Sequence, residues 1–477
     1  MLQNVLAVAL IAAPIVSSSQ IPLRMSQDYA ANSHSQDYKF DPLLHLPGIS
    51  PYFDAIGSGL NHRAPRLCEV TAASYLVRHA AIYANDDDYE TYIEPFLKKL
   101  DSTYTTTSGK KRKGWKGPLA FFEKWQSPID DPENQMEQIT PQGIIDSKKV
   151  GKHLLSKYPE LVPTTKRIYA DKKSRTQDTA RAFSKVFPQE IEIVEIGTNR
   201  SSFHSQVPHK ACDAFTKKPG NEEQQTFLAK YAPPVIARLQ QYSPVELGNY
   251  DIMGLQQMCG YESAIAGKVS KICNVFTDDE WMAYEYAWDM KYSRMVGHGN
   301  PLSPYLGFPW LNTTAQLFSK FHAPQHSESS DDEIPDDDGQ RFFISFTHRE
   351  VPPFIATALG LFNSSNAFAE EFPTDRINWS RSWRMSELIP FLGHVGIEKL
   401  TCKGLKGDAS DEGDVEEFVR IIANTAPRPI PECQGGPGAS CGFDQFVEIV
   451  KRGIEKYGDF DGVFVRIRRM FQRMVIR

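Results

Sequence analysis

The stretch Ser74–Ala84, which reads SYLVRHAAIYA, contains an apolar run that stops at Arg78 and His79. The residues from about 66 to 79 predict a strand, so this pair stands at the end of the strand. A single histidine at the end of a strand is usually a structural residue. Its role here therefore depends on which other strand ends lie beside it.

Other segments of the chain predict strands and helices in alternation. RIYAD at 167–171 predicts a short strand that leads into the helical segment SRTQDTARAFSKVF, and IEIVEI at 191–196 predicts a further strand. RFFISFTH at 341–348 predicts a strand that leads into EVPPFIATALGLF, which predicts a helix after its prolines. Late strands are expected in HVGIEKLTC and VRIIAN. This order predicts an α/β fold with a mostly parallel sheet flanked by helices.

The long stretches between these segments, about 85–160 and 210–325, are mostly helical in pattern. We expect them to be insertions that form a smaller, mainly helical lobe. The core and its insertions define one domain over 66–462, which an extension at 19–65 precedes. The residues at 463–477 form a basic C-terminal tail.

Residues that can bind phosphate stand at three of the expected strand ends. They are Arg78 and His79, then Lys172, Lys173 and Arg175, and finally His348, Arg349 and Glu350. In open α/β sheets, ligands bind outside the carboxyl ends of the strands, and helix N-termini there favour anions. Arginine also offers a planar set of donors that matches phosphate oxygens. Three such strand ends predict an anion-binding site.

On these motifs the chain resembles the histidine acid phosphatases, specifically the fungal secreted branch that includes phytases, with a phosphoglycerate-mutase-like fold. That family carries an RHGxRxP motif, a downstream phosphate-binding arginine and a late His-Asp pair. VRHAAIYA matches the first motif at Arg78 and His79, YADKKSRTQDTARAF matches the second at Arg175, and SFTHREVPPFIATALGLFN matches the third. CNVFTDDEWMAYEY and VGHGNPLSP are similar to the middle region of the family, so the resemblance spans about 66–450.

The resemblance implies hydrolysis of phosphomonoesters, with phytate among the candidate substrates, through a phosphohistidine on His79. Arg78, Arg175 and His348 would bind the phosphoryl group, and no metal ion or cofactor would be needed. An acid would protonate the leaving alcohol.

The usual donor aspartate follows the late histidine directly, where this chain has Arg349. Glu350 comes one residue later and fits the His-x-Glu pattern of inositol-polyphosphate phosphatases, so it is the candidate acid. We expect its pKa to be raised beside a phosphate.

The first motif is incomplete in this chain. Its glycine falls at Ala80, its second arginine at Ile82 and its proline at Ala84. One phosphate-binding arginine is therefore missing, and Arg349 is a candidate replacement, as are Lys172 and Lys173. An alternative function is a catalytically degenerate relative that binds phosphorylated ligands without turnover. A phosphomutase on the same fold is a third candidate, which secretion disfavours because mutase substrates are intracellular.

The chain has seven cysteines. The resemblance implies the pairs Cys68 with Cys402, Cys259 with Cys273, and Cys433 with Cys441, and it leaves Cys212 without the partner that the family has near its C-terminus. In a secreted chain such cysteines form disulfides. The sequence contains neither a CxxC pair nor a close Cys/His cluster, so it does not predict a zinc site. Four N-x-S/T glycosylation sequons occur, at Asn199, Asn312, Asn363 and Asn378.

The bulk properties fit an extracellular enzyme. A net charge of −6 over 477 residues gives no electrostatic footprint for nucleic acid. The apolar run Val5–Val16 is too short to span a bilayer and ends in small residues, which predicts a signal peptide over 1–18; a buried N-terminal strand is the alternative. We therefore expect a secreted protein whose partner is a small phosphomonoester, with neither nucleic acid nor a membrane as a partner.

Overall fold

The computed structural model describes residues 40–104, 114–197, 205–321, 339–364, 371–405 and 415–458. The predicted signal peptide at 1–18, the sequon at Asn199 and the basic tail at 463–477 lie outside these ranges.

Eight strands of the described residues form one sheet, in the order β3-β2-β4-β1-β5-β6-β7, with β8 paired to β6. Their bounds are β1 Cys68–Arg78, β2 Arg167–Asp171, β3 Glu192–Ile196, β4 Phe342–Thr347, β5 His394–Lys403, β6 Val415–Ala423, β7 Ala426–Pro427 and β8 Cys441–Gly442. β1 to β4 run parallel to one another, and β6 shares their direction because it is antiparallel to β5, which is antiparallel to β1. The predicted, mostly parallel sheet is confirmed.

β1 is the central strand of this sheet, between β4 and β5. Its last seven residues are all buried, as expected for a strand that is covered on both faces. Alternate side chains point to opposite faces. Tyr75 and Val77 belong to the apolar core on one face, whereas Ser74 lies within hydrogen-bond distance of Thr314 on the other, 3.2 Å between the hydroxyl oxygens.

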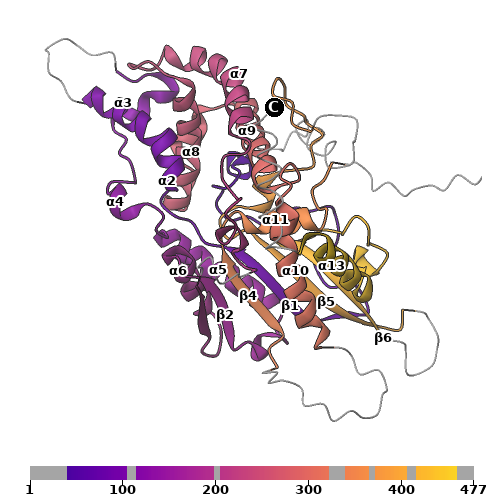
Figure 1. The fold of residues 1–477 in the computed structure, drawn as a ribbon. Coiled ribbons are helices and arrows are strands. Elements are labelled where there is room, and N and C mark those ends of the chain that lie inside the picture. The colour runs from indigo at the N-terminus through magenta and orange to yellow at the C-terminus, as the bar shows by residue number, and fades with distance from the viewer. Residues whose placement is uncertain are drawn as a thin grey trace, which may run out of the picture. The chain divides into compact units, whose positions relative to one another are not determined.

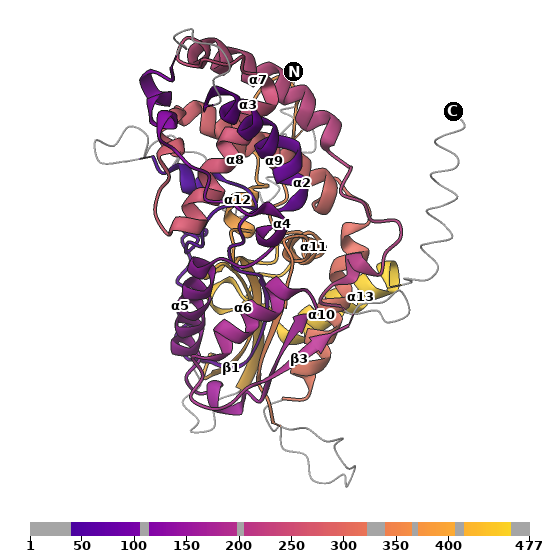
Figure 2. The same cartoon turned by 90° about the vertical axis from the view of Figure 1, so that its left-hand side faces the viewer.

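Helices cover both faces of the sheet. α5 (Pro141–Lys157) and α6 (Ser174–Ser184) lie on one face, and α10 (Ser303–Ser319) and α13 (Phe443–Tyr457) lie on the other, as Figure 2 shows. Val150 and Leu154 of α5 and Phe183 of α6 belong to the same apolar core as the strands. α11 (Val351–Ala358) packs along α10 and directs its N-terminus towards the end of β4 (Figure 1).

A group of helices forms a second, mainly helical region above the sheet in Figures 1 and 2. It contains α2 Asp86–Asp88, η2 Tyr89–Ile93, α3 Glu94–Tyr104, η3 Gly117–Glu123, α7 Asn221–Gln240, α8 Asn249–Ala266, η6 Lys271–Val275 and α9 Asp278–Val296. α5 and α10 fall inside the two stretches predicted as insertions, yet they cover the sheet. The helical lobe therefore takes up only part of those stretches.

The remaining short elements connect these layers. They are η1 Pro42–His45, α4 Pro132–Gln135, η4 Val162–Thr164, η5 Pro208–Lys210, α12 Met385–Leu388 and η7 Pro437–Ala439. Among the described helices, none combines the length and the apolar character that crossing a membrane requires.

Two helix ends differ from the sequence prediction for local reasons. α6 ends at Ser184 instead of about 187, because Pro188 follows and the residue before a proline avoids the helical conformation. α11 ends at Ala358 instead of about 362, because Gly360 adopts a left-handed conformation with φ of 69°, which is typical of a residue that ends a helix.

Three disulfides join the pairs that the resemblance implied: Cys68 with Cys402, Cys259 with Cys273, and Cys433 with Cys441. Cys68 and Cys402 are direct neighbours across β1 and β5, at the end of these strands that lies away from His79. Cys212 is a buried free thiol.

Candidate active site

The carboxyl ends of three neighbouring strands meet at one edge of the sheet. β1 ends at Arg78, β2 at Asp171 and β4 at Thr347, and Arg78 lies directly across from Thr347. Residues that follow these strands are therefore neighbours in space although they are far apart in the sequence.

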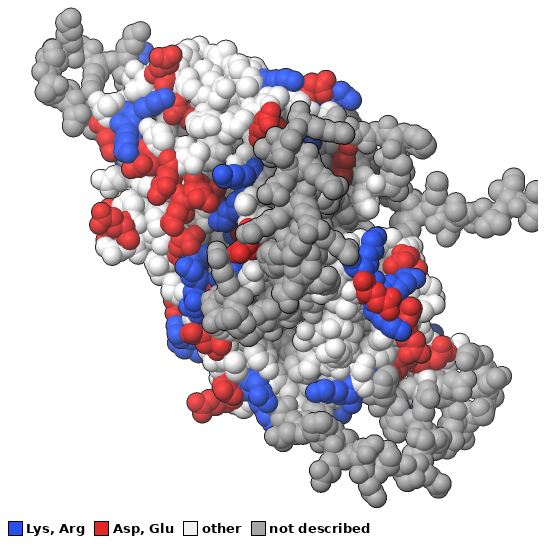
Figure 3. Space-filling model, in the orientation of Figure 1, with Lys and Arg blue, Asp and Glu red and all other residues white. Residues whose placement is uncertain are grey.

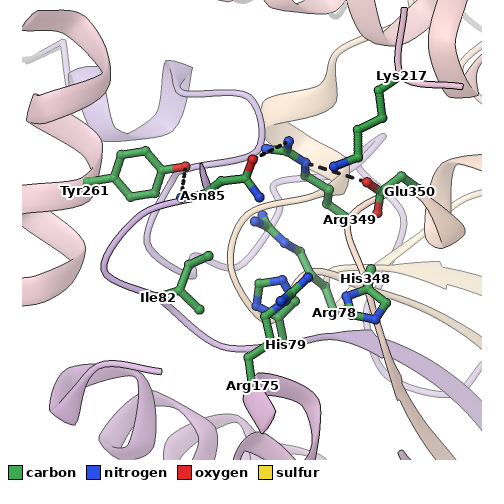
Figure 4. Close-up of a pocket in the computed structure, with 10 residues that line it drawn as sticks. All are labelled: Arg78, His79, Ile82, Asn85, Arg175, Lys217, Tyr261, His348, Arg349 and Glu350. Carbon is green, nitrogen blue, oxygen red and sulfur yellow. Dashed lines mark hydrogen bonds and ion pairs between the residues drawn. The ribbon is translucent and has the colours of Figure 1, made fainter. Parts of the chain in front are cut away.

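These strand ends surround a pocket, which Figure 4 shows. It is lined by Arg78, His79, Ile82, Asn85, Arg175, Lys217, Tyr261, His348, Arg349 and Glu350. The structure thus brings together all six residues that the sequence analysis assigned to catalysis or phosphate binding. Four lining residues are arginine or lysine and one is a carboxylate, a balance that favours an anionic ligand.

His79 is buried at the end of β1, where its backbone amide donates to the Thr347 carbonyl at 2.9 Å. Its Nδ1 lies 2.9 Å from the Ala80 carbonyl oxygen. Because a carbonyl only accepts, Nδ1 must carry the proton, and Nε2 keeps a lone pair. Burial and the nearby charges of Arg175 and Arg78 hold the pKa of His79 well below its usual value, so the imidazole is neutral.

Arg78 is held by the segment before β5. Its Nη1 donates to the Ile389 carbonyl at 2.7 Å, and its guanidinium lies 4.4 Å above the centre of the Phe391 ring. Burial and the charge of Arg349 lower the pKa of Arg78 to about 10, so it remains charged under acidic and neutral conditions. Its buried Nε finds no hydrogen-bond partner among the described residues, which leaves a donor for a ligand.

Arg175 lies in the first turn of α6 and forms an ion pair with Glu137. The other carboxylate oxygen of Glu137 accepts a hydrogen bond from Asn85 at 2.6 Å, and the Glu137 amide donates to the Ala84 carbonyl at 2.9 Å. Glu137 therefore connects Arg175 to the loop that follows His79. The Nε of Arg175 is buried and has no partner within the described part of the chain.

Arg349 occupies the pocket where the family motif would have an aspartate. Its Nη1 lies 3.3 Å from an Asp88 carboxylate oxygen and its Nη2 lies 3.4 Å from the Asn85 side-chain oxygen. Burial lowers the pKa of Arg349, but Tyr292, Asp88 and Glu350 raise it well above its ordinary value. Its positive charge is therefore permanent.

Ile82, at the position of the missing second arginine, is buried and also lines the pocket. Lys172 and Lys173, the other candidate replacements, are exposed and are not among the lining residues.

Glu350 lies at the N-terminal boundary of α11 and is almost fully buried. Burial raises its pKa, but His209, Lys217 and Arg349 lower it, and the pKa lies well below the ordinary value in the ligand-free pocket. The raised pKa expected from the sequence applies to a pocket that holds a phosphate and stays a prediction; in the free pocket the positive charges outweigh burial. A bound phosphate would add the negative charge on which that expectation rested.

Sequence reasoning missed the residues that reach the pocket from the lobe and from loops. Asn85 and Tyr261 come from the helical region, and Lys217 comes from the loop between η5 and α7. Lys217 lies 3.4 Å from Asp87, which belongs to the exposed acidic residues of α2. Figure 3 shows acidic side chains gathered over this region, with basic ones beside them.

Three of the four sequon asparagines lie among the described residues. Asn363 is exposed, whereas Asn312 on α10 and Asn378 are half-buried. Among the described residues, no group of three or more His, Cys, Asp or Glu side chains is arranged to hold a metal ion.

The family model described as the histidine phosphatase superfamily, branch 2, matches residues 69–424. The chain belongs to this family. An acid phosphatase of Komagataella pastoris is 25% identical over 430 residues, which covers 86% of this chain and 84% of that protein. A phytase of Candida albicans is 24% identical over 458 residues, which covers 91% of this chain and 89% of that protein.

The fold of this histidine phosphatase also matches solved structures. The phytase from D. castellii aligns with a TM-score of 0.72 at 21% identity, covering 90% of this chain and 89% of that one. The multiple inositol polyphosphate phosphatase of Bifidobacterium longum aligns with a TM-score of 0.60 at 13% identity, covering 86% and 97%. The resemblance read from the sequence motifs is confirmed, and the chain belongs with the phosphoric monoester hydrolases of the histidine acid phosphatase type.

Proposed function

We propose that this protein is a secreted acid phosphatase that hydrolyses phosphomonoesters through a phosphohistidine on His79. The observation that carries the proposal is the state of His79. Its Nδ1–H is tied to the Ala80 carbonyl, and its Nε2 lone pair stands among four cationic side chains. A neutral imidazole nitrogen can attack phosphorus, whereas an imidazolium cannot.

The cations of the pocket would hold the phosphoryl group during this attack. Arg78 and Arg175 each have a buried Nε without a partner among the described residues, and Arg349 adds a third guanidinium in place of the motif arginine lost at Ile82. Such donors stabilise the charge on the phosphoryl oxygens without having to reorganise.

Proton transfer would be the task of Glu350. When Nε2 of His79 forms the N–P bond, the P–O bond to the alcohol breaks, and the leaving oxygen takes a proton from the Glu350 carboxyl group. A water molecule then attacks phosphorus and returns a proton to Glu350 while the N–P bond breaks. The negative charge of the bound phosphoryl group would raise the pKa of Glu350, so that it takes up its proton at acidic pH.

The test is phosphate release from p-nitrophenyl phosphate and from phytate between about pH 3 and 7, the range in which carboxyl groups titrate. Wild type and a folded His79→Ala variant are compared. We expect release by wild type and none by the variant, together with a mass increase of one phosphoryl group on quenched wild type. The ratio of the two rates identifies the preferred substrate class.

One structural feature favours a second function, a binding protein without turnover. Ile82 places an apolar side chain in the pocket where the family has an arginine. In that case folded wild type would bind inorganic phosphate but release none from either ester, and no phosphoryl group would be trapped. Phosphate release that requires His79 would exclude it.

Secretion is a proposal that rests on the N-terminal sequence and on the fungal relatives. We expect the protein recovered from culture medium to begin after Ser18, and N-terminal sequencing would identify this cleavage. The same material would show whether Asn199, Asn312, Asn363 and Asn378 carry glycans. Retention of the residues before Ser18 in secreted protein would contradict the signal peptide.

A further inference from the structure

His348 is held from behind the pocket by a buried carboxylate that the sequence analysis did not single out. Asp171, the last residue of β2, is fully buried. Its Oδ2 lies 2.8 Å from His348 Nε2 and 2.5 Å from Lys210 Nζ. The backbone amide of Lys173 also donates to this oxygen at 3.3 Å. One carboxylate oxygen therefore faces three donors.

This contact decides which nitrogen of His348 carries the proton. Burial raises the pKa of Asp171, but His348 and Lys210 lower it well below the ordinary value, so the carboxylate is ionised and can only accept. His348 Nε2 must therefore donate. The other nitrogen, Nδ1, is buried and has no hydrogen-bond partner among the described residues. In the neutral ring, Nδ1 carries a lone pair.

A lone pair on Nδ1 restricts the ligand that the pocket can accept. A fully ionised phosphoryl oxygen is itself only an acceptor, so two acceptors would face each other. A favourable contact needs one proton between them, which a phosphomonoester monoanion carries because its second pKa is near 6.

We propose that Asp171 is a positioning residue that fixes the tautomer of His348 and couples phosphomonoester binding to the arrival of one proton at Nδ1. The proton passes from the phosphoryl oxygen to Nδ1, and the negative charge of Asp171 stabilises the imidazolium that forms. Lys210, on the same carboxylate oxygen, opposes this stabilisation. The inference rests on the proposed function, because it places a phosphoryl group in the pocket.

Charged and titratable groups face His348 from each element around it. They are Asp171 on β2, Arg175 on α6, His209 and Lys210 on η5, His79 after β1, and Glu350 at the start of α11. Burial lowers the pKa of His348 to about 3 in the ligand-free site, while Asp171 raises it and Lys210 lowers it. His348 is thus neutral before a ligand binds, and the proton has to come with the ligand.

Two substitutions are expected to act in opposite directions. Asp171→Asn keeps an oxygen for the donors but removes the charge, so it lowers the pKa of His348 in the enzyme–substrate complex. Lys210→Met removes the opposing cation and raises that pKa. In the pH profile of kcat, the basic limb reports the pKa of an acid in the enzyme–substrate complex. We expect Asp171→Asn to move the limb to lower pH and Lys210→Met to move it to higher pH, each by about one pH unit.

The matched control is Asp178→Asn, which removes a half-buried carboxylate of α6 that pairs only with the nearby Arg181 among the described contacts. Its basic limb should coincide with that of wild type. A purely structural role for Asp171 would change thermal stability and leave the limb in place. Limbs that stay fixed, or that move in the same direction in both variants, would overturn the proposal.

A second measurement does not depend on turnover. In protein with ¹⁵N-labelled histidines, the His348 signals, assigned by their loss in His348→Gln, should report a proton on Nε2 alone without ligand and on both nitrogens with inorganic phosphate at about pH 5. A proton on Nδ1 in ligand-free protein would refute the inference. If no ester is hydrolysed, the proposed function fails, and this measurement still tests the role of Asp171.

Discussion

At the scale of single residues, we propose that Arg349 replaces the guanidinium that the family motif would place at position 82. The family motif would place its second arginine at position 82, where this chain has a buried isoleucine, whereas Arg349 enters from the start of α11 and is held by Asp88 and Asn85. Arginine is suited to this exchange because its planar donors can bind a phosphoryl group from several directions.

We expect Arg349→Ala to lower kcat/KM by about a hundredfold with a raised KM, since a charged donor of this kind contributes about 3 kcal/mol. Arg349→Lys should recover only part of the loss, because an ammonium group keeps the charge but not the paired donors. The measurement is steady-state hydrolysis of p-nitrophenyl phosphate. Lys172→Ala, which alters an exposed cation beside the same strand ends, is the control and should leave KM unchanged. An unchanged KM in Arg349→Ala would contradict the exchange.

The role of Glu350 predicts a dependence on the leaving group. Glu350→Gln should slow hydrolysis of an alkyl phosphate by about a hundredfold or more, because the alkoxide needs a proton as it leaves. p-Nitrophenolate is stable without a proton, so the rate for its ester should fall much less. Equal losses for both esters would indicate that Glu350 orients the substrate and does not donate.

The sequence was sufficient to predict the residues that follow strands but not those that arrive from elsewhere. Arg78, His79, Arg175 and His348 to Glu350 were predicted because the ends of parallel strands meet. Asn85, Lys217 and Tyr261 come from the lobe and its loops. No local sequence pattern predicts that they meet at the pocket. Asp171 had the same signal as Arg78, since it ends a predicted strand, and could have been found by that rule.

At the scale of elements, the position of α11 controls the site, because His348, Arg349 and Glu350 all precede it. α10 packs closely on this helix at Gly307, where a Cβ atom would lie 2.2 Å from the Phe354 carbonyl oxygen. A side chain there would have to move the backbone of one helix.

Gly307→Ala should therefore displace α11 and lower both stability and kcat/KM, the latter by about tenfold or more, since small displacements of catalytic groups are costly. Thermal unfolding and steady-state kinetics check this. Gly435→Ala is the control, because no other atom lies within 4 Å of a Cβ built at that residue. Full activity in Gly307→Ala would show that the two helices can separate without cost to the site.

The strands were predictable because their apolar runs are short and bounded, as in RIYAD, whose predicted bounds match β2. The layer in which a helix lies was less predictable from the sequence. α5 and α10 resemble the helices of the lobe in sequence, and only tertiary contacts decide that they cover the sheet.

At the scale of the whole molecule, a buried cluster of charged side chains joins segments that are far apart in the sequence. Arg381 is almost fully buried, with its Nη2 3.0 Å from Glu285 and its Nε 2.8 Å from Asp289, both on α9. His45 from η1 lies 3.3 Å from the same Glu285. The segment near residue 45, the helical lobe and the segment before β5 thus meet at one group of ions.

Arg381→Met should lower the free energy of unfolding by about 3 kcal/mol, because the buried Asp289 loses its ion-pair partner, while Glu285 keeps Arg384 and His45. Urea unfolding followed by tryptophan fluorescence measures the change. Arg376→Met removes the same side chain from an exposed pair with Asp375, and we expect it to change the free energy by less than about 0.5 kcal/mol. A similarly small change for Arg381→Met would mean that the cluster does not stabilise the folded protein.

The strand order has a further consequence for biosynthesis. β1 leads directly into His79, yet both of its neighbours, β4 and β5, are formed by residues 342–403. While the ribosome makes the intervening segments, β1 is an apolar strand with no sheet partner, and pairing over such long separations is slow. The nascent chain must keep this strand from aggregating until residues 342–403 have been made, which makes β1 a segment that chaperones would have to protect during synthesis.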